Sequence, residues 1–260
     1  MNVSGLSVFI YKSVRGSAVW KGEAGMEFVA NVGKNVEIEV SGDVYLRHAI
    51  QTRIITAKDN YIDVLKEYVT GIYQEGDILS ISEKIISICQ NRTIRREDIK
   101  IGRLAKFLSG FACQASPKGY GVGVPIKMQY AINKIGPLRI LFASVAGGLF
   151  KAFGIKGVFY KIAGPEISGL DGFYDGAWEE YRDIGIEIPY DSTAVCNEIK
   201  HKLGMSCMIV DANALGQEIL GKSDDIELGN KTLKQMIRDN PAGQGQQRTP
   251  LILIRKKAEI

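Results

Sequence analysis

The chain has 260 residues, of which 45% are hydrophobic and 24% are charged, and its formal net charge is +4. This composition excludes a disordered chain and supplies enough apolar material for a core without disulfides or a structural metal. The 29 glycines show no Gly-X-Y period, which excludes collagen and indicates many tight turns. The small positive charge does not by itself indicate a nucleic-acid partner.

The cysteines and the apolar segments indicate a soluble, cytoplasmic protein. No pair of the four cysteines has C-x-x-C spacing and only two histidines could join them, so a zinc site is not expected. Scattered thiols are typical of a reducing cytosol, although an even count is also compatible with a secreted protein. The most apolar stretch, residues 138–155, is interrupted by Arg139 and Lys151 and is too short to span a bilayer. We therefore expect a buried helix there and no membrane partner.

Residues 1–56 have the pattern of a strand-rich segment, which we expect to pack on a main body formed by residues 57–260. Residues 27–32 and 35–40 each alternate apolar and polar side chains with a period of two. Because Gly33-Lys34 lies between these two runs, the sequence predicts a hairpin that turns there.

The rest of the chain mixes helical and strand patterns without strict alternation. The expected class is therefore α+β, with mixed, largely antiparallel sheets and flanking helices. The expected helices are residues 60–72, a segment through Ile88, 95–108, two helices after residue 125, 192–203 and a last helix through Ile237. The expected strands are residues 78–82, 156–162, 207–210 and 250–254. Residues 107–125, which include a glycine-rich loop, are expected to be an insertion.

Two segments suggest anion binding, and each has a simpler interpretation. Residues 95–106 carry five basic side chains that could bind a polyanion, although a solvated helix face is the more common role, so nucleic acid is not an expected partner. Residues 216–223 match the G-x-x-x-x-G-K-[ST] pattern of a P-loop. Glu218 would repel a phosphate, and the 37 residues after Ser223 are too few for the other strands of a P-loop sheet. We expect an ordinary loop there.

Three short segments carry residue types suited to phosphate or metal chemistry. In the first, a strand ends at Ser82 and Lys84 begins a helix, which favours phosphate, with an ordinary capped helix as the alternative. In the second, Glu166 lies in a glycine-rich acidic stretch that either approaches a cation or forms a solvated loop. In the third, Asp211 ends an apolar strand, where it either binds a metal or caps a turn.

Six features in order resemble the coenzyme F-420:L-glutamate ligases (gamma-glutamyl ligases) over roughly residues 52–255. They are Asp59-Asn60 at a helix start; Gly76-Asp77-x-Leu79-x-x-Ser82-x-Lys84-Ile85-x-Ser87 followed by Arg92; Gly157-x-x-x-x-x-Ala163-Gly164-x-Glu166-x-Ser168; Pro189-x-Asp191-Ser-x-Ala194; an apolar strand ending at residues 211–216; and Gly243-Gln244 followed by Pro250 and a strand to Arg255. Their order and spacing, more than any one motif, carry the resemblance.

The resemblance implies a gamma-glutamyl-ligase-like α+β fold, a homodimer, and addition of glutamate driven by GTP and a divalent metal. The residues it implies for the nucleotide are Arg53, Ser82, Lys84, Gly243 and Gln244. Those it implies for Mg²⁺ or Mn²⁺ are Glu166, Asp211, Asn213 and Gln244, and those it implies for catalysis are Lys84, Glu166 and Asp211.

The expected function is an amide ligase that uses GTP or ATP to add a glutamate-like amino acid to a carboxylate acceptor through an acyl phosphate. Three positions depart from the family pattern. Glu166 stands in place of an aspartate, Gly169 in place of an asparagine that contacts the nucleotide, and Asn213 in place of an aspartate. The departures at Gly169 and Asn213 motivate the alternative, a nucleotide- or ligand-binding paralogue without ligase activity.

Overall fold

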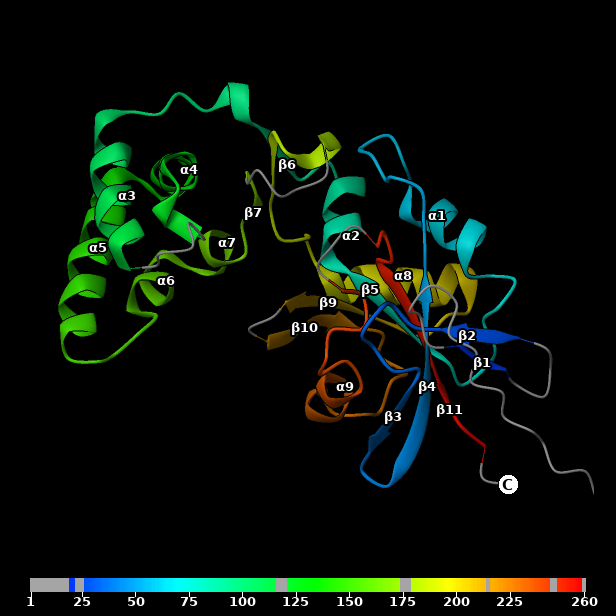
Figure 1. Cartoon of the computed structure of the whole chain (residues 1–260). Helices are drawn as coiled ribbons and strands as arrows, with labels where there is room; N and C mark the ends of the chain where they lie inside the picture. Colours follow the sequence, from blue (N-terminus) through cyan, green and yellow to red (C-terminus); the bar gives the residue numbers. More distant parts are fainter. Residues whose placement is uncertain are drawn as a thin grey trace, which may run out of the picture. The chain divides into compact units, whose positions relative to one another are not determined.

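The computed structural model describes residues 19–21, 26–115, 121–173, 179–213, 216–243 and 247–258 (Figure 1). The chain forms two compact units, one of residues 1–90 with 189–260 and one of residues 91–188. Helices flank largely antiparallel sheets, which confirms the expected α+β class.

The first unit is built on a six-stranded sheet with the order β10-β9-β5-β11-β4-β3. Its strands are β3 (Glu37–Val40), β4 (Asp43–Ile50), β5 (Ile78–Ser82), β9 (Cys207–Asn213), β10 (Gly216–Lys222) and β11 (Leu251–Lys256). β5 and β9 run parallel, and the other four pairs run antiparallel. β11 therefore joins two parts of the sheet that come from distant parts of the chain.

Helices cover both faces of this sheet. They are α1 (Tyr61–Tyr68), α2 (Glu83–Cys89), α8 (Ser192–Leu203) and α9 (Asn230–Met236). In Figure 1, α9 lies on one face and α2 and α8 lie on the other, with α1 beside them. The predicted starts of α1 and α8 are confirmed, because the Asn60 side chain accepts a hydrogen bond from the Ile62 amide and the Asp191 side chain from the Ala194 amide.

The predicted hairpin between residues 27–32 and 35–40 is wrong. β2 (Glu27–Val29) pairs with β1 (Val19–Lys21), and β3 pairs with β4 across the two-residue turn Ser41-Gly42. Ser41 and Gly42 both have positive φ, 56° and 90°, which is the turn geometry that matches the twist of a hairpin. Gly33 instead lies in a turn between strands of different sheets.

The two units also divide the chain differently from the expected boundary at residue 57. Residues 37–50 are part of the main sheet because β4 pairs with β11 over six residues. The chain leaves this unit after α2 and returns to it just before α8. The expected insertion at residues 107–125 lies within the second unit, although residues 116–120 are outside the described residues.

The described residues of the second unit form a small sheet and five α-helices. Its strands β6 (Thr93–Arg95), β8 (Ile184–Ile186) and β7 (Asp171–Gly172) pair in that order. The helices are α3 (Arg103–Ala115), α4 (Pro125–Ile135), α5 (Pro137–Ala152), α6 (Val158–Ala163) and α7 (Pro165–Ser168). Their core includes Ile126, Met128, Ile140 and Ile167.

Three predictions for this unit are wrong. Residues 95–108 are not one helix, because a strand ends at Arg95 and α3 begins only at Arg103. Residues 158–163 form α6 in place of the expected strand, and Gly157 enters it in the left-handed conformation (φ 81°). The apolar helix α5 is not buried, because packing on α6 and α4 covers only one side of it. None of the described helices has the length and apolar character of a bilayer span.

A buried ion pair at the end of β11 gives a test of this fold. Arg255 donates from Nε to Oδ1 of Asp77 at 2.7 Å and from Nη2 to Oδ2 at 2.6 Å, and Asp77 is 2% exposed. Asp77→Ala leaves this half-buried guanidinium without its carboxylate, so we expect a loss of about 3–5 kcal/mol in the free energy of unfolding. Chemical denaturation measures it.

The control for this prediction is Asp63→Ala, which removes the exposed partner of Lys66 on α1. This substitution should change the free energy of unfolding by less than about 0.5 kcal/mol. Equal losses in the two variants would contradict the assigned role of the Arg255–Asp77 pair.

Candidate functional site

Several predicted site segments meet at one end of the six-stranded sheet. β5 and β9 run parallel with Ser82 opposite Val210, so the residues that follow each strand emerge at the same end. β11 runs the other way, and its start lies at this end too, because the Ser82 amide donates to the Pro250 carbonyl at 2.8 Å. Residues 50–53, 82–84, 211–213 and 240–243 are referred to below as the sheet-end site.

Lys84 is the cation at the start of α2. Its side chain is 42% exposed, and its Nζ lies 3.9 Å from Oε1 of Glu83, a residue that is almost fully buried. The side chain of Ser82 makes no capping bond to the helix. α2 has only seven residues, so the ammonium group of Lys84, more than a helix dipole, is what this segment offers to a phosphate.

Arg53 is held in place by Asp59. Nη2 of Arg53 lies 2.7 Å from Oδ1 of Asp59, and the other carboxylate oxygen accepts bonds from the amide and hydroxyl of Thr56. The hydrogen bond from Arg53 is the main cause that lowers the pKa of Asp59 to about 2. The guanidinium is thus fixed near the end of β4 while its side chain stays 46% exposed.

The Asp59 carboxyl predicts a pH dependence of stability. Its pKa of about 2 lies below the ordinary value of 3.8, so the ionised group stabilises the fold above pH 4, and this contribution is lost as the pH falls toward 2. Asp59→Asn should therefore lessen the fall in thermal midpoint between pH 4 and pH 2. Asp63→Asn, on the exposed face of α1, should keep the wild-type profile. A wild-type profile in Asp59→Asn would refute the pairing.

Asp211 lies on β9 with Glu218 directly opposite on β10. Opposite residues of an antiparallel pair project from the same face, about 5 Å apart at Cβ. Val210 and Ala212 pack toward α9, so Asp211 projects from the face that α8 covers. Carboxylate oxygens are ligands that divalent cations prefer, so this pair supplies two candidate ligands for a cation. Glu218 was not predicted, and only the register of the β9–β10 hairpin reveals it.

Gly243 lies close to the end of β9. Nδ2 of Asn240 donates to the carbonyls of both Ala212 (3.3 Å) and Gly243 (3.2 Å), which ties the two segments together. Gly243 has a φ of 76°, in the left-handed region that favours glycine. The side chain of Asn213 and the whole of Gln244 lie outside the described residues.

Glu166 belongs to the second unit, so the predicted ligands are divided between the two units. Its carboxylate lies 4.0 Å from Nη2 of Arg92 and 3.6 Å from Nζ of Lys134. The same two cations lie 3.3 and 3.0 Å from Glu187. The Tyr130 hydroxyl also donates to Glu187, and burial together with this bond raises the pKa of Tyr130 well above its ordinary value. Glu166 is therefore part of an ion-pair network.

A metal centre made of protein side chains alone is not evident. Among the residues that the structure describes, no three His, Cys, Asp or Glu side chains come together as a group able to hold a metal ion. Of the four predicted metal ligands, Asp211 is the one at the sheet-end site whose side chain is described.

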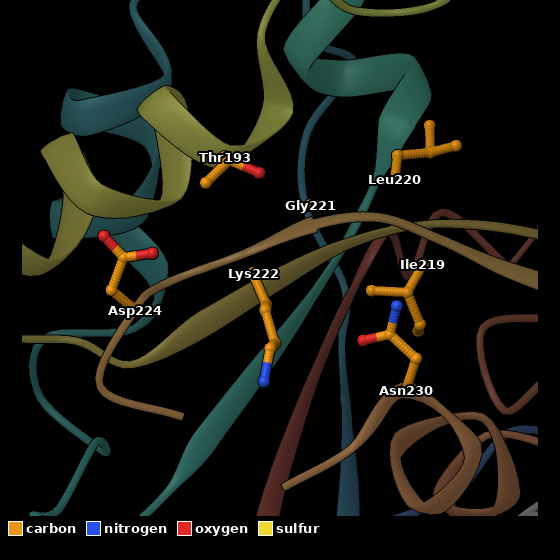
Figure 2. A pocket seen from close by; sticks show the side chains of 7 residues that line it. All are labelled: Thr193, Ile219, Leu220, Gly221, Lys222, Asp224 and Asn230. Atoms are coloured by element: carbon orange, nitrogen blue, oxygen red, sulfur yellow. The ribbon is translucent and has the colours of Figure 1, made fainter. Parts of the chain in front are cut away.

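The P-loop-like residues 216–223 form strand β10 and its end, so the expectation of a loop is wrong. Nζ of Lys222 donates to the carbonyls of Ile226 and Leu228 at 2.5 and 2.8 Å, and so stabilises the chain after the strand. A pocket of about 280 Å³ lies along this strand (Figure 2). Figure 2 shows Leu220 and Lys222 extending from opposite sides of the strand. This arrangement is not that of a phosphate-binding loop.

Gly221 tests the packing of β10 against α8. A Cβ atom at this position would lie 2.5 Å from backbone atoms of Ser192 and Thr193, which cannot move aside as a side chain can. We expect Gly221→Ala to lower the free energy of unfolding by about 1–3 kcal/mol. Gly216→Ala, at the other end of β10 with nothing within 4 Å of the added atom, is the matched control and should be nearly neutral. Equal stabilities in chemical denaturation would contradict this packing.

Comparison with protein-family models and with curated proteins finds no match for this chain. We therefore infer a function from the geometry of the sheet-end site and from the motifs in the sequence.

Proposed function

We propose that the protein is a ligase that uses a nucleoside triphosphate and a divalent metal to join a glutamate-like amino acid to a carboxylate acceptor. The nucleotide, GTP or ATP, would bind at the sheet-end site. The observation that supports this most is the parallel pairing of β5 with β9, which brings Ser82 and Lys84 to the same end of the sheet as Asp211. A cytoplasmic homodimer related to the coenzyme F-420:L-glutamate ligases is part of the same proposal.

The charges at this site suit a triphosphate. Arg53 follows β4 and Lys84 follows β5, the two strands that flank β11, and both side chains are partly exposed. Ligands of sheets with parallel strands commonly bind beyond the carboxyl ends of those strands. Gly243 adds a segment without a side chain, through which the backbone can approach a phosphate.

A divalent cation fits the oxygen donors of this site. Asp211 and Glu218 offer carboxylates on adjacent strands, and Asn213 and Gln244, which the resemblance implies, would complete the set. Glu166 would have to leave Arg92 and Lys134 to bind a cation, so we place the metal at Asp211. Bound there, Mg²⁺ or Mn²⁺ would neutralise charge on the phosphates during transfer.

The reaction would proceed in two displacements. An oxygen of the acceptor carboxylate attacks the γ-phosphorus, and the bond to the β-phosphate breaks, which releases the nucleoside diphosphate and forms an acyl phosphate. The amine of the amino acid then attacks the acyl carbon, inorganic phosphate leaves, and the amine loses a proton. The ammonium of Lys84 would hold the γ-phosphate and offset its charge in the first displacement.

Lys84→Ala tests the proposed site. We expect a fall of about 10²–10³-fold in metal-dependent phosphate release with glutamate and candidate acceptors, because a positioned charge is lost. Lys202→Ala, which removes a similarly exposed lysine from the end of α8, is the control and should retain wild-type release. Wild-type release by a folded Lys84→Ala protein would refute the assignment.

The alternative is a nucleotide- or ligand-binding paralogue without ligase activity, which the substitutions at Gly169 and Asn213 favour. Thermal unfolding with GTP or ATP and Mg²⁺ or Mn²⁺, together with the turnover assay, distinguishes the ligase from a paralogue without ligase activity. A nucleotide at 100 times its Kd should add about 2.7 kcal/mol of stability. Stabilisation without turnover for any acceptor would favour the alternative, and no stabilisation by any of these nucleotides would contradict both.

A further inference from the structure

The second unit contains a long stretch of one charge sign. From residue 99 to residue 165 the chain has ten Lys and Arg residues and no Asp or Glu, so this stretch carries +10. The whole chain carries +4, which leaves −6 for all the other residues (4 − 10). Eight of these basic residues are exposed: Lys100, Arg103, Lys106, Lys134, Arg139, Lys151, Lys156 and Lys161.

Helix α5 exposes a row of large apolar side chains within this stretch. The row consists of Leu138, Leu141, Phe142, Val145 and Leu149, which are 82%, 44%, 65%, 63% and 58% exposed. Their spacing of three and four residues puts them on one face of the helix. The buried residues Ile140 and Ala143 lie on the other side, where α6 packs closely against Gly147. The apolar face is thus the side of α5 turned away from the core of the unit.

Helix α3 repeats this arrangement. Leu104, Phe107 and Phe111 are 38%, 61% and 63% exposed, with a spacing of three and four residues. The rings of Phe107 and Phe111 meet edge to face with their centres 5.0 Å apart. Ala105 and Leu108 of the same helix are buried, so the exposed residues form only part of its surface. Two helices of one unit therefore present phenylalanine and leucine to solvent among exposed cations.

This combination of chemistry favours a lipid surface over other partners. Helices that lie in a membrane interface bury Phe and Leu at the boundary of headgroups and acyl chains while Lys and Arg contact anionic headgroups. A polynucleotide would use the cations but would leave the aliphatic side chains of α5 in water. An anionic bilayer satisfies both features, because its charge is opposite to that of residues 99–165.

We propose that α3 and α5 bind the surface of an anionic lipid bilayer, with their apolar faces in the interface and the surrounding Lys and Arg on the headgroups. Such binding needs no spanning helix, so it agrees with the lack of one among the described residues. The expectation of no membrane partner rested on the absence of a spanning segment. This inference is independent of the proposed ligase reaction and holds or fails without it.

Vesicle flotation of the full chain tests this inference. Vesicles of phosphatidylcholine alone are compared with vesicles of equal parts phosphatidylcholine and phosphatidylglycerol. We expect at least tenfold tighter binding to the anionic vesicles, weakened by salt. The double variant Phe107→Ser with Phe142→Ser should lose this binding at an unchanged thermal midpoint, because both side chains are exposed. Val32→Ser, which removes an exposed side chain from the first unit, should bind as wild type does.

The charges are tested separately by Lys151→Gln and Lys156→Gln. Each of these substitutions removes one positive charge and should weaken binding to anionic vesicles about fivefold. Lys66→Gln on α1 is the control and should have no effect. Equal binding of the wild type to both vesicles, or undiminished binding of the Phe107→Ser and Phe142→Ser variant, would overturn the inference. Two further outcomes would overturn the inference if the wild type does not bind anionic vesicles. In one, the wild type is a dimer that the Phe107→Ser and Phe142→Ser variant converts to a monomer. In the other, the wild type binds a polynucleotide.

Discussion

The insertion of β11 between β4 and β5 is the constraint on which the first unit depends. Without it, the β3–β4 hairpin and the β5-β9-β10 group would be two separate sheets with no shared backbone bonds. Residues 251–254 of β11 are all buried, so the same strand supplies the centre of the core. Its beginning fixes the end of β5 through the Pro250 carbonyl, and its end places Arg255 against Asp77. The candidate site and the buried ion pair thus share one source of rigidity.

The sheet-end site follows from that arrangement. β11 pairs with β4 on one side and with β5 on the other, and β5 in turn pairs with β9 in parallel. Residues separated by more than 100 positions, such as Lys84 and Asp211, therefore emerge at the same end of one sheet. Cations and carboxylates at one end of a rigid sheet are what a triphosphate with a divalent metal requires. The second unit contributes a different chemistry, since Glu166 there is part of a network with Arg92 and Lys134.

The sequence predicts those helix starts and strands that depend only on interactions between residues close together in the chain. Asn60 and Asp191 cap helices because their side chains reach nearby amides, and the strand at residues 78–82 follows from an apolar run after a turn. Pairing was not predictable in this way. The sequence predicts a hairpin turn at Gly33-Lys34, whereas the hairpin of the structure turns at Ser41-Gly42. Both segments contain residue types that favour turns, and tertiary pairing selects between them. The apolar sequence of α5 predicted burial, but composition does not say how much of a helix its neighbours cover.

The residues of the candidate site also fall into two groups, those that the sequence indicates and those that depend on strand pairing. Ser82 ends β5, Lys84 lies in the first turn of the helix that follows, and Asp211 lies near the end of β9. The sequence indicates these positions because the apolar run of each strand stops close to them. Glu218 was not predictable, because its place opposite Asp211 depends on the register of a hairpin. The same glutamate argues against a P-loop in the sequence and lies opposite Asp211 in the fold.

Hydrogen–deuterium exchange with and without GTP or ATP and Mg²⁺ tests whether the nucleotide binds at the sheet-end site. We expect slower exchange in peptides covering residues 80–90, 208–218 and 240–250, and no change in residues 125–165. These segments are far apart in the sequence, so their joint protection would reflect their meeting at one end of the sheet. Protection confined to residues 158–170, or no protection at saturating nucleotide, would contradict binding at this site.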